Sequence, residues 1–330
     1  MPDPAEGSLE DSAGLKPCAT TSGVAQAFKL SSGAAQAFKL SSGVAQAFKL
    51  SSVVAQAFKP AILAACFVLA FAASAVAQQP QPVVAPAPPA PTYLARYDFH
   101  MSIASLMTST ATPPPVVPDE RFSWDAHFGG SFDIVDFTFV RLGVAADYQT
   151  VMGSEYRSFD PNQGNYTLDG VVSFRVNADT EVAGLFHHVS RHLSDRPKPF
   201  AVAYNEVGAR VMGRRSLWAT TVDVDVEGGR AVQHSYVDYT WLAQGHVLLR
   251  HPVNARVGLF AHGSGQVFAV DETVAGRGTQ AGGLIEAGVR LIGRAGALEI
   301  FAGYEKRVDA DPLDRLPRRW GLAGFRLLSR

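Results

Sequence analysis

The stretch Tyr166-Thr-Leu-Asp-Gly-Val-Val-Ser-Phe-Arg-Val176 alternates apolar and polar side chains along its length. Successive side chains of a strand point to opposite faces, so this stretch has one apolar and one polar face. A strand that crosses a membrane needs this pattern, because one face meets lipid and the other meets a wet interior. Only a closed barrel leaves no unpaired sheet edge in the bilayer. The stretch therefore predicts an all-β, transmembrane, antiparallel β-barrel.

Similar segments fill the rest of the chain, and we expect about 12 strands, near residues 93–108, 121–131, 136–150, 165–177, 180–192, 204–213, 216–227, 237–250, 255–270, 279–293, 297–307 and 319–329. Tight turns, at Asn177-Ala-Asp179, Gly213-Arg-Arg215, His251-Pro-Val-Asn254 and Arg294-Ala-Gly296, alternate with longer polar connections at 154–165, 191–203 and 308–318. Short periplasmic turns, longer outer loops and an even strand number are typical of bacterial outer-membrane barrels. The first two strands have the weakest pattern, so ten or fourteen strands are the alternatives.

The N-terminal third indicates export. The apolar run from Pro60 to Ser74 follows Lys59 and precedes Ala75-Val-Ala77, which is typical of a cleavable signal peptide over 59–77. The run is shorter than the roughly 20 residues of a spanning helix. A lipoprotein signal ending at Cys66 and an uncleaved anchor are the alternatives. Residues 1–58 form a low-complexity leader, and we interpret its decapeptide repeat as a translated upstream segment, with the true start nearer Val53. We interpret the Pro/Ala-rich residues 78–92 as a stiff periplasmic tail.

Composition excludes several functions. The 29 basic and 30 acidic residues give a net charge of −1, so the chain lacks the basic surface that nucleic acid requires. Both cysteines, Cys18 and Cys66, precede the predicted cleavage point. The exported chain therefore has no thiol for a disulfide, a zinc–thiolate site or a cysteine nucleophile.

Side-chain parity separates a lipid face from a lumen face. The outward set includes Val140, Leu142, Val144, Tyr148, Tyr239, Trp241, Val247 and Leu249. The inward set is polar and charged: His100, His127, Arg141, Asp147, Gln149, Asp169, Arg175, Glu206, Arg210, Asp238, Gln244, His246, Arg250, Arg256, His262, Glu286, Arg290, Glu299, Glu305 and Arg307. Mixed charges in a barrel of this size favour a salt-bridged interior over a wide pore, with a narrow channel as the alternative.

Polar residues also occur on the lipid-facing parity, at the outer end of the strand over 180–192. His188 and Ser190 are two residues apart and point the same way, and Asn205 has the outward parity on the next strand. A serine hydroxyl becomes a nucleophile when an imidazole takes its proton and a third polar group holds that imidazole. We therefore predict Ser190 as nucleophile, His188 as base and Asn205 as its orienter. The alternative is a non-catalytic polar patch in the headgroup zone.

These residues resemble outer-membrane phospholipase A. That family carries a histidine-x-serine pair on a lipid-facing strand of a twelve-stranded barrel, with an asparagine on the following strand, as His188-Val-Ser190 and Asn205 do here. The resemblance implies a lipid acyl-ester hydrolase at the outer leaflet, with calcium as cofactor. The chain departs from the family after the serine, where Arg191-His192 replaces Asn-Gly and the connection to Asn205 is longer. We expect membrane lipids and lipopolysaccharide as partners and leave homodimerisation open.

Other interpretations compete with this one. Lipid A deacylases resemble the chain in their histidine-x-serine pair but use a glutamate, for which Glu206 is the nearest candidate and has the wrong parity. The run from His188 to Asp195 also resembles an H-x-S-x-H-L-x-D segment of outer-membrane barrels of unassigned function, in which His192 and Asp195 would fix a loop. A metal bound by His187, His188 and His192 is disfavoured, because neighbouring side chains point to opposite faces. A non-enzymatic barrel, either a narrow channel or a structural protein, is the rival function.

Overall fold

The computed structural model describes residues 84–108, 120–194, 196 and 198–329. Its elements are β1 (Thr92–Tyr93), β2 (Tyr97–Thr108), β3 (Trp124–Phe137), β4 (Val140–Gly153), β5 (Asp160–Asn177), β6 (Thr180–Leu193), β7 (Val202–Leu217), β8 (Thr220–Ser235), β9 (Tyr239–Pro252), β10 (Val257–Val270), α3 (Glu272–Ala275), β11 (Gln280–Ile292), β12 (Gly296–Asp311) and β13 (Leu316–Ser329). Among the described residues, no helix is both long and apolar enough to cross a membrane.

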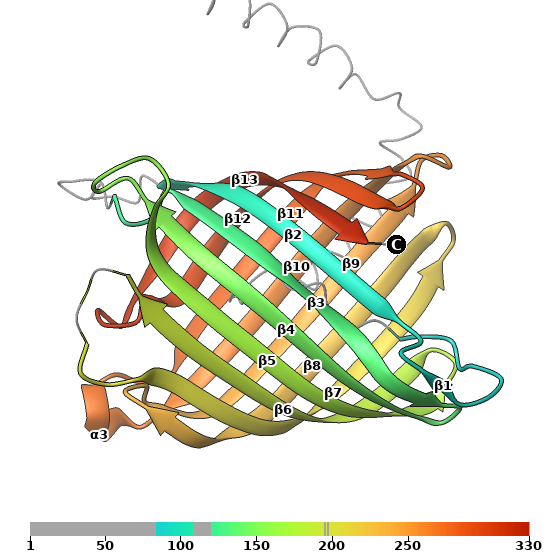
Figure 1. The fold of residues 1–330 in the computed structure, drawn as a ribbon, viewed down its shortest axis with the longest axis horizontal. Coiled ribbons are helices and arrows are strands. Elements are labelled where there is room, and N and C mark those ends of the chain that lie inside the picture. The colour runs from blue at the N-terminus through green and yellow to red at the C-terminus, as the bar shows by residue number, and fades with distance from the viewer. Residues whose placement is uncertain (1–83, 109–119, 195, 197, 330) are drawn as a thin grey trace, which may run out of the picture. The chain divides into compact units, whose positions relative to one another are not determined.

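The strands from β2 to β13 close into a twelve-stranded antiparallel barrel (Figure 1). Each pairs with its neighbours in the chain, and β13 pairs with β2, so the sheet has no free edge in the wall. The short β1 adds a pairing to β3 at one rim. The prediction of an all-β barrel with about 12 strands is confirmed.

The two ends of the barrel differ. The C-terminal end of β13 and β1 lie at one end, and α3 lies at the other (Figure 1). Two-residue turns, such as Trp218–Ala219 between β7 and β8, stand at the first end, which is therefore periplasmic. Large apolar side chains cover the outer wall, as Phe128, Phe174 and Val226 do with more than half of each side chain exposed. An apolar exterior around a polar interior makes this an outer-membrane barrel.

Two of the predicted breaks between strands are misplaced. The basic residues Arg214 and Arg215 were expected in a turn, but β7 continues through them to Leu217, because Arg214 pairs across the strands with Asp223 at 2.6 Å between Nε and Oδ1. The break expected near 132–135 is also absent. There, β3 runs on to Phe137 with a register shift between Asp133 and Val135, and such a bulge interrupts the alternation without ending the strand.

Two predicted side-chain directions are also wrong. Tyr239 was expected on the lipid face, yet it is 4% exposed and lies inside the barrel. A register shift at Ala269 and Val270, opposite the start of β9, changes the parity there. Arg256 was expected in the lumen, but it stands in the exposed turn before β10.

Ion pairs cross the lumen, as predicted. Arg141 reaches Glu181 at 2.6 Å, and Arg326 reaches Glu286 at 2.7 Å. The carboxylate of Asp147 joins His100 at 2.7 Å and His127 at 2.9 Å, so both histidines are lumen hydrogen-bonders. These buried charges have close partners, so the interior is an ion-paired polar core, and it encloses a cavity of about 120 Å³ lined in part by Asp169, His187 and Tyr239.

The tail before the barrel enters its periplasmic end. Val84 is 4% exposed and packs with Ala183 and Met212. The backbone N–H of Ala85 donates to Glu181 at 3.2 Å, and its carbonyl accepts from Arg175 at 3.2 Å. This part of the expected extended tail therefore fills the lumen. The predicted leader and signal peptide lie outside the described residues.

Candidate functional site

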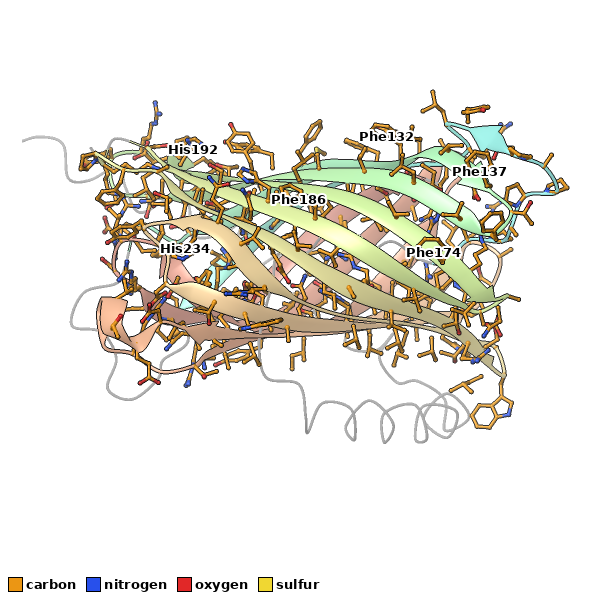
Figure 2. The ribbon with its side chains drawn as sticks, turned by 90° about the horizontal axis from the view of Figure 1, so that it is seen from below. Phe132, Phe137, Phe174, Phe186, His192 and His234 are labelled. Carbon is orange, nitrogen blue, oxygen red and sulfur yellow. The ribbon has the colours of Figure 1, made fainter. Side chains whose placement is uncertain are left out.

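The outward row of β6 changes from apolar to polar toward the outer end. Phe186 is followed at two-residue steps by His188, Ser190 and His192, each at least partly exposed. Figure 2 shows Phe186 on this wall and His192 nearer the end of the barrel, where His234 also lies. Polar side chains on a lipid-facing surface are costly in the hydrocarbon region and tolerated near the interface, which fits this position.

His188 and Asn205 are directly opposite each other on β6 and β7. The Nδ1 of His188 lies 2.6 Å from the Oδ1 of Asn205. Since a carboxamide oxygen only accepts, the imidazole donates through Nδ1–H and its Nε2 is left as the acceptor. The predicted histidine orienter is therefore in contact with the predicted base.

A third strand fixes the orientation of Asn205. Gln233 on β8 faces Asn205, and its Oε1 accepts a hydrogen bond from Asn205 Nδ2 at 2.8 Å. With its amide nitrogen engaged there, Asn205 keeps its oxygen toward His188. Sequence reasoning missed Gln233, because a register shift between Asn205 and Glu206 hides which β8 residue faces Asn205.

Ser190 has a different partner from the one its spacing predicts. Its Oγ hydrogen-bonds to Nε2 of His192 at 3.1 Å, and the His192 ring stands edge-on to Tyr166, with centroids 5.2 Å apart. Within the described residues no hydrogen bond joins Ser190 to His188. All three predicted site residues share one wall, but only His188 and Asn205 touch. The side chain of Ser190 lies between those of His188 and His192, each two residues away along β6.

The opposite faces of these strands belong to the lumen. His187 bonds to Asp169 at 2.6 Å inside the barrel, and Glu206 is 2% exposed there. Glu206 therefore cannot serve as the third member of a lipid-facing triad. Asp195, the last residue of the H-x-S-x-H-L-x-D segment, lies outside the described residues.

Calcium prefers six or more oxygen ligands, carboxylates above all. The cross-strand neighbours of Ser190 are Tyr166 and Ala203, and neither carries a carboxylate. In the described part of the chain, no three His, Cys, Asp or Glu side chains are grouped to hold a metal ion. The residues present around Ser190 thus do not fit a calcium ion by themselves.

The end of β12 crosses the outer mouth of the lumen. Residues 308–312 are all buried, which breaks the alternation of the strand, and β12 shifts register between Arg307 and Asp311. The carboxylate of Asp309 accepts from the Tyr239 hydroxyl at 2.5 Å and from Arg277 Nη1 at 2.5 Å, while Arg191 donates to its carbonyl at 2.6 Å. This tip therefore contacts β6 and β9 on the far wall and covers the lumen.

Arg277 joins that tip to the β8–β9 loop, and we expect this contact to be sensitive to acid. Burial acts to raise the pKa of Asp238, but hydrogen bonds from Arg277, at 2.6 and 2.7 Å, outweigh it and hold the pKa below its ordinary value. The ionised Asp238 therefore stabilises the closed mouth when the pH is above about 3.9, the ordinary pKa of an aspartate. That stabilisation is lost as the pH falls through the lowered pKa.

We therefore expect residues 271–279 to be protected at pH 5 and to open below about pH 4. Amide hydrogen exchange of the folded barrel, corrected for its intrinsic pH dependence, would measure this. Arg277→Gln should expose the loop already at pH 5. Equal protection of the wild type from pH 5 to pH 2.5 would contradict the prediction.

The fold and this wall define a twelve-stranded outer-membrane barrel with an ordered histidine–asparagine pair on its lipid face. No protein-family model matches the sequence. No curated protein matches it either.

Several solved barrels are similar to the chain. The outer membrane phospholipase of Salmonella typhi, a dimer with bound calcium, is 11% identical with a TM-score of 0.43, over 71% of this chain and 90% of that one. The Escherichia coli outer membrane phospholipase A is 12% identical with a TM-score of 0.44, over 71% and 92%. LpxR from Salmonella typhimurium is 8% identical with a TM-score of 0.40, over 70% and 99%. The likeness concerns the fold.

Proposed function

We propose that this barrel hydrolyses acyl esters of membrane lipids at the outer leaflet, with Ser190 as nucleophile, His188 as general base and Asn205 as the group that orients His188. The observation that carries the proposal is the 2.6 Å contact between His188 Nδ1 and Asn205 Oδ1 on the lipid-facing wall. This contact supports a single tautomer of His188, in which Nε2 is the acceptor. Ser190 is two residues further along the same face of β6.

The chemistry follows from these positions. As Ser190 Oγ attacks the ester carbonyl carbon, its proton passes to His188 Nε2, and the Asn205 oxygen stabilises the imidazolium. The tetrahedral intermediate then expels the lysolipid alcohol, which takes the proton from His188. Water, deprotonated by His188, then attacks the acyl carbonyl, and the bond to Ser190 Oγ breaks as Oγ takes that proton back from His188, which releases the fatty acid and restores the serine. Rotation of the Ser190 side chain from His192 toward His188 must precede the first step.

The two histidines beside Ser190 are expected to differ in importance. Only His188 has a carboxamide partner, so His188→Ala should remove activity, whereas His192→Ala should change kcat by less than about tenfold. Fatty-acid release from phospholipid in mixed micelles by the refolded barrel would measure both. If His192→Ala abolished release and His188→Ala did not, His192 would be the base and the proposed assignment would be wrong.

The assay should be run with calcium and with a chelator, and over a range of protein concentrations. The similar Salmonella typhi phospholipase is a dimer with bound calcium. Since the described residues of one chain do not group around a metal, a calcium-dependent rate that rises with protein concentration would point to ligands from a second copy.

A non-enzymatic barrel is the second candidate. It is favoured by the hydrogen bond between Ser190 and His192, which leaves the predicted nucleophile away from His188, and by the ion-paired lumen. Under this proposal the polar wall contacts lipid headgroups or lipopolysaccharide without reacting. Release of fatty acid no faster than by Ser190→Ala, from both phospholipid and lipopolysaccharide, would establish it.

A further inference from the structure

Two cations face each other on the outer wall of β12 and β13. Lys306 and Arg319 are direct cross-strand partners. Their chain neighbours Arg307 and Trp320 are buried in the lumen, so alternation turns Lys306 and Arg319 outward, and Arg319 is exposed. Within the described residues, neither side chain has a hydrogen bond or ion pair. Like charges directly opposite on a sheet repel, so this pair is unfavourable unless an anion lies between them.

The pair stands at the outer edge of the apolar wall. Toward the periplasm, the outward positions of β12 are Tyr304, which is 41% exposed, and Ile300, which is 53% exposed; on β13 the corresponding exposed residue is Phe325. An exposed tyrosine between an apolar band and a charged pair marks the membrane interface, where lipid headgroups begin. The two cations therefore meet headgroups and not acyl chains.

Two glycines lie beside the pair. Gly283 lies opposite Lys306 on β11, and Gly321 lies opposite Tyr304 on β13. A side-chain carbon placed at Gly321 would lie in ordinary van der Waals contact with Met107, at 3.8 Å, so an atom fits there without displacing a neighbour. Tyr304, whose hydroxyl can donate a hydrogen bond, is two residues from Lys306 and so shares its face of β12.

We propose that Lys306 and Arg319 together bind the phosphomonoester of an outer-leaflet lipid headgroup. A phosphomonoester carries between one and two negative charges near neutral pH and three acceptor oxygens, which matches two adjacent cations better than a singly charged phosphodiester does. Charge-assisted hydrogen bonds to arginine and lysine are the usual means of holding such a group. This site is on β12 and β13, separate from the wall of β6 and β7, and does not depend on the proposed hydrolysis.

Native mass spectrometry of the full refolded barrel, released from detergent micelles that contain one lipid probe, tests the proposal. Phosphatidic acid supplies the phosphomonoester, phosphatidylglycerol the phosphodiester and phosphatidylcholine a zwitterion. We expect phosphatidic acid to be retained at least fivefold more than phosphatidylglycerol. The variant Lys306→Gln/Arg319→Gln should lose that preference, whereas Arg294→Gln, which removes an exposed cation from a periplasmic turn, should keep it.

Three results would overturn the proposal: unchanged retention in the double variant, equal retention of the two anionic lipids, or full competition by equimolar inorganic phosphate. The last would mean an adventitious ion only. Heat-modifiable mobility on a gel reports folding. If the glutamine variant does not fold, the exchange Lys306→Arg/Arg319→Lys keeps both charges and should keep the preference, and its loss would count equally against the site.

Discussion

Ser190→Ala is expected to reduce lipid ester hydrolysis at least about 1000-fold in kcat, which corresponds to about 4 kcal/mol of lost transition-state stabilisation. The loss is large because the acyl group has no other covalent acceptor, and a histidine alone must then activate water without a positioned nucleophile. KM should change little, since the hydroxyl contributes little to binding a lipid. Initial rates of fatty-acid release from phospholipid micelles would measure both constants.

A matched serine provides the control for this experiment. Ser105 on β2 also points outward and is partly exposed, but it lies on a different wall of the barrel, away from any histidine in β6. Ser105→Ala should leave the rate within twofold of the wild type. Equal rates for wild type, Ser190→Ala and Ser105→Ala would show that any observed release comes from a contaminant or from another site, and the proposed nucleophile would be rejected.

The barrel is predictable from sequence because its rule is local. Alternation over two residues separates lipid from lumen along most strands, and it correctly placed Arg141, Glu286 and Arg307 inside. The rule fails where the ladder is irregular. Tyr239 lies inside because of a register shift, and β7 extends past Arg214 because of an ion pair to the next strand. Neither a bulge nor a cross-strand partner is visible in a single strand's pattern.

For the candidate site, too, the sequence predicts which wall the residues share but not every contact between them. Parity placed His188, Ser190 and Asn205 on one wall, and cross-strand pairing then set His188 against Asn205. The rotamer of Ser190 does not follow from parity, because histidines at both −2 and +2 are equally near along a strand. Which one it bonds depends on Tyr166, which comes from β5 and holds the His192 ring. That contact is a property of the assembled sheet.

Arg326→Met is expected to destabilise the barrel by about 3–5 kcal/mol. Arg326 donates to Glu286 at 2.7 Å and to Glu299 at 2.9 Å, and its guanidinium lies 4.9 Å from the Phe301 ring centroid. All of these side chains are buried, so the substitution leaves Glu286 with only His262, at 3.4 Å, and Glu299 with only Arg290. Urea unfolding of the barrel in lipid vesicles would measure the change in free energy.

The size of that loss should come from the stranded carboxylates and not from the missing guanidinium. Adding Glu286→Gln to Arg326→Met should therefore recover a large part of the stability, since a neutral amide costs much less to bury than an unpaired charge. Arg294→Met, in an exposed periplasmic turn, should change stability by less than about 0.5 kcal/mol. If the double variant were as unstable as Arg326→Met, packing of the arginine against Phe301 would be the main contribution. Side-chain packing in the lumen would then contribute more to the stability of the barrel than the balance of charges does.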